Sequence, residues 1–286
     1  MTNYLHKVLP PQYSHVNKVY CLLAATVFCA LPLCSTEAAA ENILKYDGTT
    51  NIHGNAKTWA AKNEYDGIDI RVTGVDGGYY TDTTEALVLN NQTLNVKGKG
   101  KFVSIINTAQ NKQIDNNGGI YAKGGSTVNF TDVDSIYIAA IAGKEGGNDS
   151  TVISAKDPGR DFKGYTNIVN ISGNTVQLIG SIDVMHSLGS VFFNRNARHT
   201  VNAALSGSDS FWYGSAIGET DERTTVNLSL ADGATWIFNA GKSTLNAGGI
   251  IRNLKLDKGV VLFADAEVWE TYRKTVIKGT DYVLAL

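Results

Sequence analysis

Three pairs of carboxylates are the residues of this chain whose type and spacing best suit acid–base chemistry. The pairs are Asp132 with Asp134, Asp66 with Asp69, and Asp221 with Glu222. Enzymes that cleave polysaccharides hold two such acids beside the bond that breaks, so a β-helical lyase or glycosidase is the alternative function that these pairs leave open. Each pair adjoins a turn, however, where aspartate is favoured because its side chain bonds to the nearby backbone. We therefore expect these carboxylates to shape turns and not to catalyse a reaction.

No other residue pattern indicates catalysis or metal binding. The histidines beyond residue 40 are His53, His186 and His199, and they share no H-x-x-x-H or H-E-x-x-H spacing. The sequence has no G-x-S-x-G motif for a serine nucleophile, and no EF-hand loop or G-G-x-G-x-D repeat for calcium. We therefore predict a protein that is not an enzyme and that needs no metal and no cofactor.

A cluster of aromatic residues is the best candidate for a binding site. Phe211, Trp212 and Tyr213 follow one another, and aromatic faces stack on sugars or anchor protein contacts. In a strand, however, successive side chains point to opposite faces. The alternative is therefore that Phe211 and Tyr213 lie on one face while Trp212 packs inside.

Short strands separated by tight turns must position all of these residues. The stretch 224–265 shows the pattern most clearly, because runs such as TVNLSL, TWIF and VVLFAD alternate with ADGA, NAGKS and DKG. Glycine, asparagine and aspartate favour such turns because they tolerate a positive φ. The period of two and the absence of helical spacing predict an all-β protein.

A tripeptide related to T-V-N recurs six times along the chain at unequal intervals. The copies are TLNV at 93–96, TVNF at 127–130, IVNI at 168–171, TVNA at 200–203, TVNL at 225–228 and TLNA at 244–247. This pattern predicts a solenoid with one coil per roughly 20–25 residues and loops of variable length. We expect the Val or Leu of each copy to point inward, and the Asn to form an amide ladder along one edge or to lie at a corner.

The first 40 residues predict a cleavable signal peptide. Lys7 and Lys18 precede the apolar run 19–33, and the small residues Ala38 and Ala40 place the cleavage after Ala40. A membrane anchor is the alternative, but the run is shorter than the ~20 residues that span a bilayer. We expect residues 41–286 to form one β-helical domain, with residues 41–66 as its N-terminal cap.

The composition argues against disulfide bonds, cysteine-ligated zinc and a nucleic-acid partner. The 3 cysteines of the chain all lie within the first 40 residues, so disulfides and cysteine-ligated zinc are excluded from the exported part. The formal net charge is −2, and no basic surplus favours binding to nucleic acid.

The run DGATWIFNAGKSTLNAGGIIRNLKLDKGVV, 232–261, resembles the coils of passenger domains in pertactin-like autotransporters of Gram-negative bacteria. The resemblance extends more weakly back to about residue 87, and the long polar segment before the signal peptide's apolar run also fits that family. It implies a right-handed parallel β-helix that is exported through the inner membrane and either displayed at the outer membrane or released.

The same resemblance implies a role in adhesion or virulence, through contact with a host or matrix protein or glycan. Members of that family end in a β-barrel that lies in the outer membrane. We expect a missing segment or another chain to supply this translocator here. A third possibility is a spacer that holds a functional segment away from the cell.

Overall fold

The computed structural model describes a chain built from parallel β-strands. It describes residues 42–48, 52–54, 63–73, 85–108, 118–141, 150–156, 164–184, 196–218, 223–238 and 251–263, which all belong to the unit Glu41–Leu286. These residues form strands and contain no helix, so the predicted all-β class is confirmed. Within the same ranges, no helix is long and apolar enough to cross a membrane.

The described strands follow one another along the chain. They are β1 (Ile43–Gly48), β2 (Ile52–Gly54), β3 (Gly67–Val72), β4 (Glu85–Asn90), β5 (Thr93–Lys97), β6 (Phe102–Asn107), β7 (Gly118–Lys123), β8 (Thr127–Ala140), β9 (Thr151–Ala155), β10 (Thr166–Ile179), β11 (Ser181–Asp183), β12 (Arg198–Ser206), β13 (Phe211–Gly214), β14 (Ala216–Ile217), β15 (Thr224–Ala231), β16 (Thr235–Phe238), β17 (Ile251–Asp257) and β18 (Val260–Phe263).

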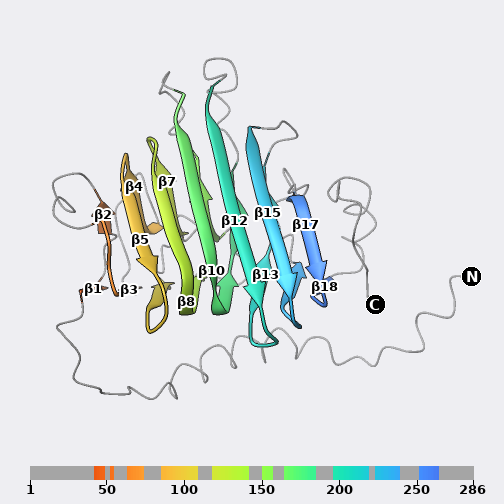
Figure 1. The fold of residues 1–286 in the computed structure, drawn as a ribbon. Coiled ribbons are helices and arrows are strands. Elements are labelled where there is room, and N and C mark those ends of the chain that lie inside the picture. The colour runs from red at the N-terminus through yellow and green to blue at the C-terminus, as the bar shows by residue number, and fades with distance from the viewer. Residues whose placement is uncertain are drawn as a thin grey trace, which may run out of the picture. The chain divides into compact units, whose positions relative to one another are not determined.

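The chain passes repeatedly through three stacks of parallel strands (Figure 1). The first stack contains β5, the first halves of β8 and β10, β12, β15 and β17. The second contains β1, β3, β6, the second halves of β8 and β10, β13, β16 and β18. The third contains β2, β4, β7, β9, β11 and β14. This repeated passage is consistent with a parallel β-helix, or solenoid.

Aliphatic side chains of the repeated tripeptide line up inside the first stack. Leu94, Val128, Val169, Val201 and Val226 are register partners, and each is at most 1% exposed. Burying one such side chain contributes about 1.5–3 kcal/mol, so every additional coil adds to the stability of the stack. The predicted inward orientation is confirmed for these five copies.

Two tryptophans extend the core of the second stack. Leu178, Trp212, Trp236 and Val261 are register partners on consecutive strands. The two indole rings stack with centroids 5.0 Å apart, and Phe238 meets Trp236 edge-on at 5.6 Å. Each indole N–H also reaches a backbone carbonyl, since Trp212 Nε1 donates to Gly180 O at 2.9 Å and Trp236 Nε1 donates to Gly214 O at 3.0 Å. The stack is therefore buried without leaving either N–H unsatisfied.

The corners between stacks use the residues that the turn pattern predicts. Asn91, Asp132 and Asp232 adopt positive φ values of 56°, 58° and 52°, and Gly98 and Gly207 adopt 99° and 84°. Asn and Asp visit this region more readily than other residues with a Cβ, and glycine does so without steric cost. The prediction that these residue types draw the corners is confirmed at these positions.

The spacing of the coils varies along the chain, and its shortest values agree with the expected period. Successive asparagines of the first stack are separated by 25 to 41 residues. The separations of 25 and 26 residues that link β12, β15 and β17 agree with the expected 20–25 residues. The longer separations of 32 to 41 residues agree with the expected loops of variable length.

Several sequence predictions fall outside the described residues. They include the signal peptide and its cleavage after Ala40, and the TLNA copy at 244–247. Within the range predicted as a cap, 41–66, β1 pairs with β3 and β2 pairs with β4.

Candidate functional site

A row of asparagine side chains runs along the outer surface of the first stack. We call this set the amide row, and its members are Asn95, Asn129, Asn170, Asn202, Asn227 and Asn253. Each Nδ2 donates to the Oδ1 of the preceding member, over 2.6–2.8 Å. The first member, Asn95, donates to the backbone carbonyl of Asn63 at 3.1 Å. Of the two arrangements expected for these residues, the ladder is the one that forms.

The register of the parallel strands creates this row. In-register pairing repeats the same position about every 4.8 Å, which is the spacing at which one side-chain amide can reach the next. All of the donors point toward the N-terminal coils, so the amide dipoles are aligned and polarise one another. The ladder also fixes the rotamer of each amide, and it therefore presents a rigid line of polar groups.

Sequence reasoning missed the last member of the row. Asn253 occupies this place in the strand IRNLKLD, which has no T-V-N tripeptide. A register shift between Val226 and Asn227 brings it there, since Val226 pairs with Ile251 and Asn227 pairs with Asn253, which leaves Arg252 as an extra residue. The sequence around it offers only an asparagine followed by leucine, as in the TVNL copy.

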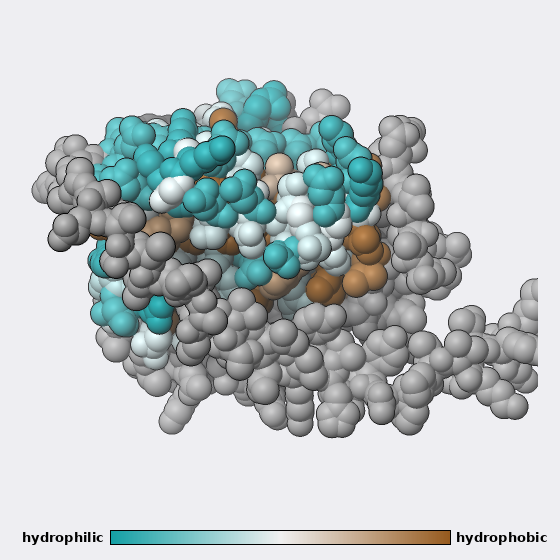
Figure 2. Space-filling model, turned by 60° about the horizontal axis from the view of Figure 1, so that its bottom comes forward, coloured by the Kyte–Doolittle hydropathy of each residue, from teal (hydrophilic) through white to brown (hydrophobic). Residues whose placement is uncertain are grey.

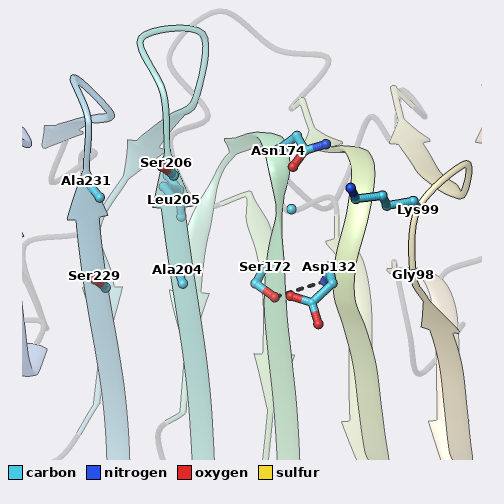
Figure 3. Close-up of a pocket in the computed structure, with 11 residues that line it drawn as sticks. Gly98, Lys99, Asp132, Ser172, Asn174, Ala204, Leu205, Ser206, Ser229 and Ala231 are labelled. Atoms are coloured by element: carbon cyan, nitrogen blue, oxygen red, sulfur yellow. Dashed lines mark hydrogen bonds between the residues drawn. The ribbon is translucent and has the colours of Figure 1, made fainter.

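A groove runs beside the amide row on the same surface. Two adjoining hollows of about 330 Å³ and 430 Å³ share Ser172, Ala204 and Ser229, which are register partners on β10, β12 and β15. Because these side chains are small, the surface is low between the amide row and the corners that lead to the second stack. Figure 3 shows Lys99, Asp132 and Asn174 at the corner side of this groove, with Ala204 and Ser229 along its floor.

The carboxylates Asp132 and Asp134 lie at one corner of this groove. Asp134 accepts hydrogen bonds from Gly100 N at 3.0 Å and from Asn174 Nδ2 at 3.3 Å. The backbone N–H of Asp132 donates to Ser172 Oγ at 3.2 Å (Figure 3), and Asp132 lines the groove. Asp134 therefore stabilises the corner, as the turn interpretation expects.

Of the other two pairs, Asp66 and Asp69 are not among the residues that line the groove. Asp66 accepts from Asn42 N at 3.0 Å and forms an ion pair with Lys101 at 3.2 Å. Asp69 lies 3.6 Å from Arg71. Asp221 and Glu222 are outside the described residues.

A buried asparagine connects three consecutive coils at the N-terminal ends of β8, β10 and β12. Asn167 is 0% exposed, and its Oδ1 accepts from the backbone N–H groups of Gly125 at 2.9 Å and Ser126 at 3.0 Å. Its Nδ2 lies 3.1 Å from Nδ1 of His199, which is also 0% exposed. The side chain of Asn167 therefore satisfies backbone donors of one coil and bonds to the next.

The two histidines beyond residue 40 that the structure describes lie in different stacks. His199 lies in β12 of the first stack and His53 lies in β2 of the third, while His186 is outside the described residues. In the described part of the chain, no group of three or more His, Cys, Asp or Glu side chains could hold a metal ion.

The aromatic cluster is divided between the inside and the outside of the second stack. Trp212 is 0% exposed and belongs to the core, whereas Phe211 and Tyr213 are half-buried on the outer surface. This is the arrangement that strand alternation predicts. The cluster therefore offers two outward aromatic rings, on a different stack from the amide row and the groove.

The groove carries few charges. Among its lining residues the ionisable side chains are Lys99, Asp132 and Lys255, all near its ends or its corner side. On the side of the molecule in Figure 2, hydrophilic and neutral residues dominate the described surface, and hydrophobic ones gather in small separate patches. Such a site suits polar contacts.

Comparison of the chain with known protein families, curated proteins and solved structures finds no match.

Proposed function

We propose that this chain is an exported, non-catalytic adhesion domain, folded as a right-handed parallel β-helix and similar to the passenger domain of an autotransporter. The observation that carries the proposal is the amide row with its groove, because it is a long, rigid and outward-facing polar surface. Its partner is a host or matrix protein or glycan.

The parallel stacks support the handedness and the fold of this proposal. Connections between parallel strands of one sheet are right-handed in about 98% of cases. Ligands commonly bind to the extended surfaces that stacked coils create.

The signal peptide predicted at 1–40 supports export through the inner membrane to the cell surface or beyond. An outer-membrane translocator barrel, supplied by another segment or another chain, is the expected partner for secretion.

Export and adhesion make a joint prediction. When the chain is produced in a Gram-negative host with its own N-terminus, the mass of the exported protein should correspond to a start at Glu41. This protein should then bind to at least one class of matrix protein or cell-surface glycan on a solid support. A chain that stays in the cytoplasm with Met1 intact, or that binds to none of these surfaces, contradicts the proposal.

A polysaccharide-cleaving β-helix enzyme is the second candidate, because Asp132 lines the groove. Release of reducing ends or unsaturated sugars from acidic polysaccharides, lost in the variant Asp132→Ala, would favour it over adhesion.

A further inference from the structure

We propose that the groove beside the amide row binds a linear, uncharged polysaccharide that lies along the direction in which the strands stack. This inference rests on the proposed adhesive function and names the ligand class for that site.

The groove runs across several strands, so an extended polymer can lie along it. It crosses the strands, because its lining runs from Thr131 of β8 through Ser172, Ala204 and Ser229 to Lys255 of β17. These residues belong to five consecutive strands, so the groove extends for about 19 Å at roughly 4.8 Å per strand. Each strand contributes similar groups, and a ligand with a repeating unit can therefore make the same kind of contact at successive steps.

The amide row offers the hydrogen bonds that sugar hydroxyls need. A side-chain amide has two N–H donors and an oxygen with two acceptor sites. The bonds along the ladder use one N–H and one acceptor site of each interior member, such as Asn202, which donates to Asn170 and accepts from Asn227. The remaining donor and acceptor lie on the same side chain, and a hydroxyl group can use both because it donates and accepts.

The charges of the groove favour an uncharged ligand. The central lining, from Asn170 to Ser229, consists of amides, hydroxyls and aliphatic groups. A polyanion would lie close to Asp132, and a polycation would lie close to Lys99 and Lys255. A polymer of either charge would therefore be attracted at one part of the groove and repelled at another.

The surface suits a polysaccharide better than an extended peptide. A peptide that binds as an added strand needs unpaired backbone groups at a sheet edge. In this stack, β10, β12 and β15 each pair with a strand on both sides. Their backbone groups are therefore engaged, and side chains make the contacts on the face. Because the ladder already fixes those side chains, a ligand does not have to order them, which lowers the entropic cost of binding.

Titration of the purified full chain with neutral linear oligosaccharides tests this inference. The probes are glucan, mannan and xylan series of increasing length, measured by calorimetry. For at least one series, the affinity should rise with chain length and level off once the groove is filled. The variant Ala204→Ile places a branched side chain on the exposed floor of the groove, where a strand tolerates it, and it should weaken binding at least tenfold.

The matched control is Lys45→Ile, which places the same side chain at an exposed position of β1 in the second stack, and it should bind as the wild type does. Circular dichroism and the melting temperature confirm that both variants fold. Unchanged binding by Ala204→Ile, or binding by charged polysaccharides alone, overturns the inference. If the chain binds matrix proteins but no oligosaccharide, the result supports the adhesive function and contradicts the polysaccharide as its ligand. If it binds neither, both proposals fail.

Discussion

Replacing Trp236 with alanine should lower the free energy of unfolding by about 3–5 kcal/mol, the range typical of large aromatic deletions in a core. Trp236 is 0% exposed, and it stacks on Trp212 with ring centroids 5.0 Å apart. The variant would leave a cavity between consecutive coils, since parallel strands held in register cannot close over it. It would also remove the N–H that donates to the carbonyl of Gly214. Urea unfolding monitored by circular dichroism measures the loss.

Two further variants separate the contributions to this effect. Trp236→Phe keeps an aromatic ring but removes the N–H, and it should cost less than the alanine variant. Thr235→Ala changes the neighbouring outward-facing residue, and it should stay within about 0.5 kcal/mol of the wild type, as surface substitutions usually do. Equal effects for Trp236→Ala and Thr235→Ala would contradict the stacked core.

The variant Asn167→Leu should destabilise the chain by several kcal/mol. Asn167 is buried, and its Oδ1 accepts hydrogen bonds from the backbone N–H groups of Gly125 and Ser126. Leucine has a similar size but no acceptor, and a buried donor such as the Ser126 N–H costs about 1–3 kcal/mol when it is left without a partner. The half-buried N–H of Gly125 would lose its acceptor as well. The contact with Nδ1 of His199 would be lost as well. Denaturant unfolding of the variant beside the wild type gives the difference.

The control for this prediction is Asn174→Leu, at an exposed corner. Its amide bonds to Asp134 over 3.3 Å at the surface, where water can replace the bond. We expect a change of less than about 1 kcal/mol, because the sites of large effects are buried. A loss at Asn174 as large as that at Asn167 would contradict the role assigned to the buried amide.

The strands and corners could be predicted from the sequence because their signals are local. The alternation in TVNL predicts that Val226 points inward, and the tolerance of Asp232 for a positive φ predicts a corner. The same alternation anticipates that Trp212 is buried between Phe211 and Tyr213. Each of these properties depends on residues next to one another in the chain.

The groove and the end of the amide row could not be predicted, because they depend on register between distant strands. Ser172, Ala204 and Ser229 form a floor only because their strands pair in one alignment, and no motif marks these small residues. Asn253 belongs to the row because of a register shift that no sequence motif predicts. The stacking of Trp212 on Trp236 likewise follows from the pairing of β13 with β16.

Cysteine cross-linking across the first stack tests most directly the claim that parallel strands are stacked in register. Thr200 and Thr225 are register partners on β12 and β15. Strands about 4.8 Å apart bring two such cysteines within the Cα separation that a disulfide accepts. With the three native cysteines replaced by serine, the pair Thr200→Cys and Thr225→Cys should form a disulfide, which mass spectrometry of the peptides detects.

The offset pair Thr200→Cys and Asn227→Cys provides the comparison, because two residues along a strand increase the Cα separation to about 8 Å, beyond the reach of a disulfide. In-register stacking predicts a cross-link in the first pair and none in the second. A cross-link in the offset pair, or none in the register pair, would contradict it.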